Sequence, residues 1–340
     1  MLTLDVMNNI RLSRRPIGQV AMATLVLGPN FNFPLRRTRI TLEGIENLPK
    51  DEPVILAMNH TDRYNYWPFQ YRLWRDHKRF TTTWVKGKYF NNKAIERFMV
   101  SMANVPVPSR GYLISADAIN LLDRPLSEEA YRLLRDALDA GESNTRMVRE
   151  AAADRGVLGE VLSVFDTARN MLGLDFDPNR QSYFEAMGEL FDRMMDRFIQ
   201  LNFEAFDLGL SILVFPEGTR ARRLSEGHTG VAQMALRLGA TVVPVGCNGS
   251  DHVYPGNSPL ARGGNIVYRL GAPLRPDGDL APFQIAEPFR PFTREAEHKY
   301  SANFRGLTDV VMERINALLD ARYQRAEGGE TLVKGSKRFM

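Results

Sequence analysis

The sequence predicts an α/β fold in which helices flank a mostly parallel central sheet. Three apolar runs of strand length, 54–58, 211–215 and 241–247, have the composition of strands buried on both faces. Strands alternate with helical segments in the first part of the chain, and such alternation produces parallel strands with right-handed crossovers. Because reactive side chains collect beyond the carboxyl ends of parallel strands, we expect a functional site in the polar residues that follow the first two runs.

Residues 63–102 supply the alternating elements. A helix is predicted over 63–74, with Pro68 in its first turn, where the missing proline N–H has no intrahelical partner to lose. The β-branched residues of 80–85 predict a strand, and residues 92–102 have helical character. Together with the run at 54–58, this region has the order strand, helix, strand, helix.

A helical insertion is expected at about 111–200. Ser127 is suited to cap a helix that begins with two glutamates. Residues 182–201 carry apolar side chains at steps of three and four, which predicts a further helix. Its Met- and Phe-rich stripe is typical of a core-facing helix; the alternative is that these adaptable side chains help to line a ligand groove.

The last third of the chain is interpreted from its caps and prolines. A glycine after an apolar periodic segment predicts a helix end, and a threonine between apolar residues predicts a capped helix start with a hydrophobic staple. The predicted elements are a helix over 229–238 ended by Gly239, a strand over 265–270, irregular chain over 273–291, a last helix from Thr308 to about Tyr323, and a disordered tail over 334–340.

The N-terminal segment combines basic and apolar residues. Arginines at 11–15 precede an apolar stretch, 17–27, which is shorter than the roughly 20 residues that a membrane span needs. With the basic group at 36–39, the stretch suits a segment lying in a membrane interface; the alternative is a core-packed helix. An interfacial segment should be removable, so deleting residues 1–38 is expected to leave a folded remainder.

We divide the chain into three parts on this basis, because no internal repeat or flexible linker marks another boundary. Residues 1–38 are expected to form an N-terminal helical element in the membrane interface. Residues 39–290 form the α/β domain with its helical insertion. Residues 291–340 supply a C-terminal helix and a basic tail.

The composition excludes several classes of function. A formal net charge of +4 suits an anionic membrane surface or anionic substrates as well as nucleic acid, and charge alone does not separate these. The single cysteine, Cys247, excludes a disulfide framework, and its place in an apolar run favours a core side chain over a nucleophile. The five scattered histidines give no metal site, and no glycine-rich loop indicates a nucleotide cofactor.

Three short motifs occur in order along the chain: Asn59-His60, Phe215-Pro216-Glu217-Gly218-Thr219-Arg220 and Val243-Pro244-Val245. Together they resemble the glycerolipid acyltransferase superfamily, which contains the lysophosphatidate and glycerol-3-phosphate acyltransferases. Lys86 and the stretch 105–110 lie where that family has its lysine-containing strand and its arginine-bearing block. The resemblance covers residues 39–110 and 200–275.

The resemblance implies an O-acyltransferase that moves a fatty acyl group from acyl-CoA or acyl-carrier protein to the free hydroxyl of a lysophosphatidate-like glycerolipid. His60 would be the general base. In the family a His-x4-Asp motif orients the histidine, but here the fifth residue after His60 is Asn65. Asn65, Asp62 or a carboxylate from elsewhere could hold the ring; Asp62 is also suited to the start of the following helix. If Asn65 occupies the orienting position, Asn65→Asp is expected to raise the rate.

The motif blocks also imply the substrate-binding residues. Arg220 is the leading candidate for holding an acceptor phosphate, since its planar fork can bind two oxygens; Arg110 is second and Lys86 third. Glu217 is interpreted as an orienting carboxylate, either for the acceptor or for its own loop. Gly218 and Thr219 complete the substrate-binding set.

The implied partners follow from the reaction. They are a lyso-phospholipid acceptor, an acyl thioester donor that serves as co-substrate with no further cofactor, and a membrane surface. The protein would bind that surface peripherally or monotopically on its cytoplasmic face, and no nucleic-acid partner is expected. Two alternatives remain open: a catalytically altered relative that binds lipids or acyl chains, and an acyltransferase for a non-phosphate lyso-lipid, which would not need Arg220.

Overall fold

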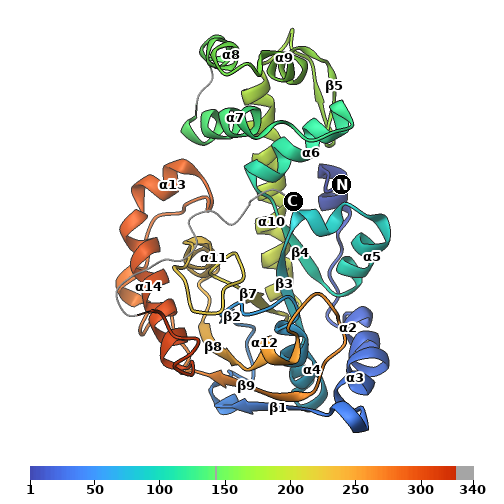
Figure 1. Ribbon diagram of the computed structural model, residues 1–340. Coiled ribbons are helices and arrows are strands. Elements are labelled where there is room, and N and C mark those ends of the chain that lie inside the picture. The colour runs from blue at the N-terminus through green and yellow to red at the C-terminus, as the bar shows by residue number, and fades with distance from the viewer. Residues whose placement is uncertain (142–143, 327–340) are drawn as a thin grey trace. The chain divides into compact units, whose positions relative to one another are not determined.

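A seven-stranded sheet organises the fold in the computed structural model, which describes residues 1–141 and 144–326 (Figure 1). The strand order is β1-β9-β8-β2-β7-β3-β4. The pairs β1–β9, β8–β2, β2–β7 and β7–β3 are parallel and β8–β9 is antiparallel, so the prediction of a mostly parallel sheet is confirmed. The strands are β1 (Thr38–Glu43), β2 (Ile55–Met58), β3 (Thr81–Lys86), β4 (Asn104–Val107), β7 (Ser211–Val214), β8 (Val242–Asn248) and β9 (Gly264–Leu270).

The three apolar runs form neighbouring strands. β2 lies between β8 and β7, and every residue of these three strands is buried. Ile55 of β2 is level with Ile212 of β7 and Val242 of β8. Because β2 and β7 are parallel and in this register, the loops that follow them leave the same edge of the sheet next to each other.

The helices that follow the strands lie close to their predicted positions. α4 (Tyr66–His77) begins three residues later than predicted, and α5 (Lys93–Ser101) and α11 (Gly230–Leu238) match the expected segments. Gly239 ends α11 with a φ of 59°, a left-handed conformation that glycine adopts without steric cost.

The predicted start of the last helix at Thr308 is wrong. α14 spans Ser301–Ala317, and the Thr308 hydroxyl donates to the carbonyl of Phe304 at 2.7 Å. A threonine can thus bond backward within a helix instead of capping one. The capping threonine is Thr293, which accepts from the Ala296 N–H at the start of α13 (Arg294–Lys299). The helix also ends before the predicted Tyr323, and the tail predicted to be disordered, 334–340, lies outside the described residues.

The chain forms two compact units. The first comprises Met1–Arg11, Val85–Val100 and Val105–Leu201; the second comprises Leu12–Trp84, Ser101–Asn104 and the chain from Asn202 onward. The helices that lie in the first unit, wholly or in part, are α1 (Leu4–Asn9), α5, α6 (Arg110–Leu122), α7 (Glu128–Ala140), α8 (Thr145–Asp154), α9 (Leu158–Asp166) and α10 (Tyr183–Asp207).

A hairpin in the first unit interrupts the predicted run of helices. β5 (Arg169–Met171) and β6 (Leu174–Phe176) pair antiparallel across Leu172 and Gly173, whose φ angles of 51° and 100° suit a two-residue hairpin turn. Arg169 pairs with the buried Asp117 at 2.6 Å. The three-residue strands carry too little periodicity to be recognised from sequence.

One face of the N-terminal helix belongs to the core of the second unit. Residues 17–32 are continuously helical, as α2 (Ile17–Ala21), a π-helical segment (Met22–Leu27) and α3 (Gly28–Asn32). Its buried side chains pack in the same cluster as Trp67 and Phe69 of α4. They are Met22, Ala23, Leu27 and Phe31.

Other residues of this N-terminal segment are apolar and exposed. They are Ile17, Leu25, Val26, Phe33 and Leu35, with exposed fractions between 46% and 87%. The segment therefore contributes to the core and also presents apolar surface. Within residues 1–141 and 144–326, no helix has the length and apolar character that crossing a bilayer requires.

The buried face generates a stability prediction. Phe31→Ala should lower the free energy of unfolding by about 3–5 kcal/mol, because it removes a fully buried ring from the core. Phe33→Ala is the matched control: this ring is 52% exposed, and the change should be about 0.5 kcal/mol or less. Urea unfolding of both variants measures the difference, and equal losses would contradict it.

Because residues 17–32 contribute buried side chains to the core, deleting residues 1–38 is expected to expose that core rather than leave a folded remainder.

Candidate active site

Asn59 fixes the end of β2 against β8. Its Oδ1 accepts from the backbone N–H of Cys247 at 2.7 Å, and its Nδ2 donates to the Cys247 carbonyl at 3.1 Å. The side chain is 98% buried and replaces the backbone pairing that the strand would otherwise continue. His60 therefore leaves the sheet from a rigid point.

Asn65 holds the ring of His60. Nδ1 of His60 lies 3.1 Å from Oδ1 of Asn65. The amide orientation follows from its other end, because Nδ2 donates at 2.8 Å to the carbonyl oxygen of Asn59, which can only accept. Oδ1 therefore faces the ring and Nδ1 carries the proton. The neutral ring then has its basic lone pair on Nε2.

The same contacts bear on Asn65→Asp. Asn65 is fully buried, and its carbonyl accepts from the hydroxyl of Tyr268. An aspartate would set an oxygen against the Asn59 carbonyl, and a buried group left without its partner costs about 1–3 kcal/mol. The rate gain that the sequence suggests for this substitution is thus opposed by a structural cost.

Asp62 is engaged in its own turn. Its Oδ1 accepts from the Tyr64 N–H at 2.8 Å and its Oδ2 accepts from the Thr61 hydroxyl at 3.0 Å. Burial raises the pKa of this carboxyl above its usual range. Because α4 begins at Tyr66, the interpretation of Asp62 as a helix-start residue is wrong. Of the groups considered for holding His60, the structure brings Asn65 to the ring.

Glu217 joins the loop after β2 to the loop after β7. Its Oε1 accepts from the backbone N–H of His60 at 2.7 Å, and its Oε2 accepts from the N–H and hydroxyl of Ser225 at 2.9 and 3.0 Å. The side chain is 97% buried, and this burial raises its pKa to about 7 against the opposing effect of the hydrogen bonds. These contacts favour the loop-orienting interpretation over contact with an acceptor.

The rest of the motif forms an exposed turn beside His60. Gly218 has a φ of 63°, and a Cβ there would come within 2.9 Å of the His228 ring, so the turn requires glycine. Thr219 and Arg220 follow at its exposed tip. The next residue, Ala221, bonds this turn to the histidine: its N–H donates to the His60 carbonyl at 2.9 Å.

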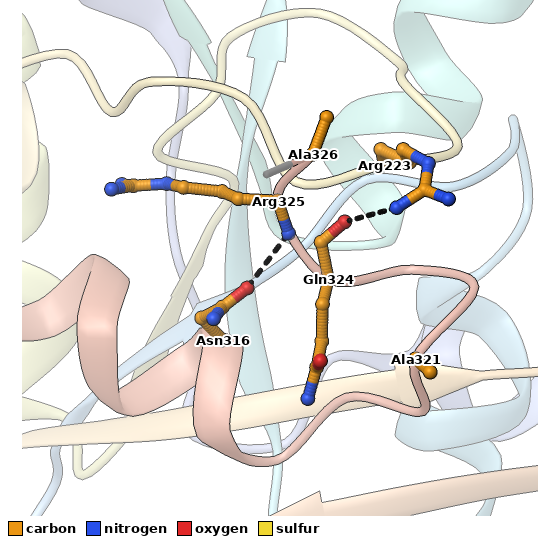
Figure 2. A pocket seen from close by; sticks show the side chains of 6 residues that line it. All are labelled: Arg223, Asn316, Ala321, Gln324, Arg325 and Ala326. Atoms are coloured by element: carbon orange, nitrogen blue, oxygen red, sulfur yellow. Dashed lines mark hydrogen bonds between the residues drawn. The ribbon is translucent and has the colours of Figure 1, made fainter. Parts of the chain in front are cut away.

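The end of the described chain braces this loop. The Leu224 N–H donates to the Tyr323 carbonyl at 2.8 Å, and Arg223 donates to the Gln324 carbonyl at 3.3 Å. A cavity of about 640 Å³ lies beside these residues. Figure 2 shows Arg223 and Arg325 on opposite sides of it. This cavity is polar and basic, and it adjoins the loop that carries Arg220.

Lys86 and Arg110 belong to the first unit, whereas His60 and Arg220 belong to the second. Lys86 is the exposed last residue of β3. Arg110 is the first residue of α6; its guanidinium lies 4.3 Å from the centre of the Phe191 ring and 4.0 Å from Asp139. Nothing in these contacts assigns either residue to the site at His60.

Sequence reasoning missed three residues that shape the site. Phe215 stacks on the His60 ring with centroids 4.1 Å apart, Ser225 binds Glu217, and Tyr268 binds the Asn65 backbone. Phe215 is the first residue of the recognised motif, and that position was the signal that could have indicated a place in the site. Ser225 and Tyr268 lie 8 and 203 residues from their partners, and no local pattern indicates such pairings.

The described residues offer few other reactive groups at this point of the fold. Cys247 is fully buried and its pKa is raised by that burial, so its thiol is unsuited to act as a nucleophile. Among the described residues, no three or more His, Cys, Asp or Glu side chains are grouped so as to hold a metal ion. The site presents an oriented imidazole, a buried carboxylate and an exposed arginine.

The acyltransferase family model matches residues 39–147 and 176–248, more than half of the chain. Among solved structures, the chain is similar to the 1-acyl-sn-glycerophosphate (LPA) acyltransferase PlsC of Thermotoga maritima, at 13% identity over 92% of this chain and 80% of that one. The TM-score is 0.39, too low for this likeness to bear on the site. No curated protein sequence matches.

The raised pKa of Glu217 predicts a pH dependence of stability. A carboxyl whose folded pKa lies above its unfolded value adds stability that is complete below pH 4.5 and is lost as the pH rises through 7. The shift corresponds to about 3 kcal/mol. The free energy of unfolding, measured in urea, should therefore fall between about pH 5 and about pH 8. The fall should be larger in the native protein than in Glu217→Gln, by about that amount. An identical pH dependence in the two proteins would show that Glu217 does not titrate in this way.

Proposed function

This chain belongs to the acyltransferase family, and from that premise we propose that it moves a fatty acyl group from acyl-CoA or acyl-carrier protein to the free hydroxyl of a lysophosphatidate-like glycerolipid. His60 acts as the general base. The observation that carries the proposal is the contact between His60 Nδ1 and Asn65 Oδ1, which leaves Nε2 as the basic nitrogen.

The reaction needs one proton carrier and no covalent intermediate on the protein. Nε2 of His60 takes the proton of the acceptor hydroxyl as its oxygen attacks the thioester carbonyl. Collapse of the tetrahedral intermediate breaks the carbon–sulfur bond, and the imidazolium returns the proton to the leaving thiolate. Asn65 keeps the ring in the required tautomer but adds no negative charge, so it supports a weaker base than a carboxylate would.

The acceptor side of the proposal is supported by Arg220. It stands exposed at the tip of the turn whose next residue bonds to the His60 backbone. A guanidinium at that place can bind two oxygens of an acceptor phosphate and bring a neighbouring hydroxyl toward the base. We infer a phosphate-bearing lyso-lipid as the acceptor on this ground.

A membrane surface is the place where such an acceptor is found. The apolar side chains exposed along residues 17–35 are followed by Arg36, Arg37 and Arg39, a composition that suits an interfacial segment on an anionic leaflet. We propose that the protein binds the cytoplasmic face of a membrane through this segment, peripherally or monotopically.

One observation favours a second candidate function. Asn65 stands where the family's motif has a carboxylate, so the protein would also suit a role as a lipid- or acyl-binding relative with weak or no catalysis. Thiol release from acyl-CoA, measured with and without lysophosphatidate, separates the two. Acceptor-dependent release supports the transferase, whereas lipid binding without release supports the binding protein.

His60→Ala should lower acceptor-dependent thiol release by about 10²-fold to 10⁴-fold, the usual contribution of a positioned general base. His77→Ala, which removes an exposed histidine in the last turn of α4, is the matched control and should retain the native rate. A His60→Ala protein with native activity would exclude the mechanism.

Arg220→Ala should reduce the use of a phosphate-bearing acceptor by about 10-fold to 100-fold, since losing a charge-assisted contact costs about 1.5–3 kcal/mol. Hydrolysis of the acyl donor alone should change little. Arg222→Ala, two residues on and also exposed, serves as the control. If both reactions fall equally in Arg220→Ala, the loop has collapsed and the head-group assignment is wrong.

The exposed apolar surface gives a third prediction. The double substitution Leu25→Ser and Leu35→Ser should weaken binding to phosphatidylcholine vesicles that contain phosphatidylglycerol by at least about tenfold, because burying one leucine contributes about 1.5–3 kcal/mol. Thermal unfolding should be unchanged, since both side chains are exposed. Met147→Ser, which alters a similarly exposed residue of the first unit, should bind as the native protein does. Native-like vesicle binding by the double variant would refute the interfacial assignment.

A further inference from the structure

The aromatic ring of Phe215 lies against the imidazole ring of His60. The two centroids are 4.1 Å apart and the ring planes make an angle of 21°, which is a stacked arrangement. For a neutral imidazole such a stack is a packing contact. Once the imidazole is protonated, the contact gains an electrostatic part, because the face of a benzene ring carries partial negative charge.

Phe215 is held in this position through its backbone and its side chain. It directly follows β7, and its carbonyl accepts from the Gly218 N–H at 3.0 Å. The Tyr66 ring, from the first turn of α4, meets the Phe215 ring at 68° with centroids 6.2 Å apart. Both side chains are half-buried and pack against the main core cluster of the second unit. The stack is therefore part of the ordered fold of that unit.

The proposed reaction places a positive charge on the His60 ring, because Nε2 takes the proton of the acceptor hydroxyl. The side chain that holds Nδ1 is the Asn65 amide, which is neutral. An aspartate in that place would stabilise the imidazolium by its charge, as in a catalytic triad. The face of Phe215 offers another source of stabilisation, worth about a factor of two to five in an equilibrium constant.

The ionisable groups of the surrounding segments are engaged with other partners or lie at the surface. The Asp62 carboxylate accepts from donors of its own turn, and that of Glu217 accepts from backbone N–H and hydroxyl groups. The ionisable side chains of the two loops and of the start of α4 include Asp62, Arg63, Tyr66, Glu217, Arg220 and His228. All of them are retained when position 215 alone is changed, so the comparison isolates the stack.

We propose that Phe215 is a positioning residue whose aromatic face stabilises the protonated form of His60, where the neutral Asn65 supplies no charge. The proposal deepens the proposed function and rests on it for its catalytic consequence. Its effect on the His60 ring exists without any substrate, so that effect is measurable apart from catalysis.

A trifluorinated phenylalanine at position 215 tests the stack while keeping an aromatic ring in place. Fluorine withdraws electron density from the face, so the midpoint of the His60 titration, followed by NMR of labelled histidine rings, should move to lower pH by about half a unit. Phe215→Leu should move it in the same direction. The exposed His77 is the internal reference and should titrate as in the native protein. Thermal unfolding confirms that each protein is folded.

The matched control places the same fluorinated residue at position 289. The Phe289 ring packs on Tyr300 and Phe304, with centroids 5.6 and 5.5 Å away. Fluorination there should leave the His60 midpoint unchanged.

The pH dependence of transfer gives a second measurement. Fluorination at position 215 should lower kcat for acceptor-dependent thiol release by about twofold to fivefold at alkaline pH, with the KM for the acceptor unchanged. The difference should narrow toward acidic pH, because a ring with a lower titration midpoint stays neutral to a lower pH. A contact that serves packing alone would not produce this narrowing.

Two results would overturn the proposal: a His60 midpoint that stays in place or rises on fluorination, and a ratio of native to fluorinated kcat that is the same at every pH. Either would reduce the stack to a packing contact. If the midpoint falls as expected but the native protein releases no thiol in response to acceptor, the stabilisation by Phe215 is supported and the proposed reaction is refuted. The two failures are therefore distinguishable.

Discussion

The hydrogen bond from the His60 ring to Asn65 is the contact on which the proposed chemistry depends. A histidine serves as a base only if one ring nitrogen is protonated and held while the other stays available to accept a proton. Here the Asn59 carbonyl fixes the Asn65 amide, and the amide fixes the ring. Asn59 is itself bonded to β8 through the Cys247 backbone, so the position of the His60 ring is set by the pairing of two parallel strands.

Glu217 extends this arrangement to the neighbouring strand. As a buried carboxylate it carries a desolvation cost, visible in its raised pKa, and three donors from two loops offset part of that cost. The arrangement orders the turn that carries Arg220 relative to His60. Phosphate recognition and proton transfer would therefore rely on two loops that the Glu217 side chain holds together. This role explains why an acidic residue is buried there.

Much of the fold could be predicted from sequence because the signals were local. The buried strands, the helix ended by Gly239 and the capping role of Ser127 each depend on neighbouring residues, and the structure reproduces them. The predicted helix start at Thr308 was wrong because its hydroxyl bonds to the Phe304 carbonyl within α14. The sequence does not show which of these two bonds a threonine will form. The prediction that Asp62 starts a helix was wrong because its carboxylate bonds within the turn before α4. The position of that turn depends on tertiary packing. The sequence indicated that Asn65 could hold the His60 ring, because the two residues are five apart. The pairing of Glu217 with His60 and that of Tyr268 with Asn65 could not be foreseen, since strand order decides which distant segments meet.

The tautomer of His60 tests the central claim most directly. Nitrogen NMR of protein labelled in its histidine rings, with the His60 signals identified by their loss in His60→Ala, reports which ring nitrogen is protonated. For the neutral form of the ring, the structure predicts the proton on Nδ1 and an unprotonated Nε2, and a mixture of tautomers once Asn65→Ala removes the acceptor. A native ring protonated on Nε2 would contradict the account, because the nitrogen assigned as the base would already carry a proton.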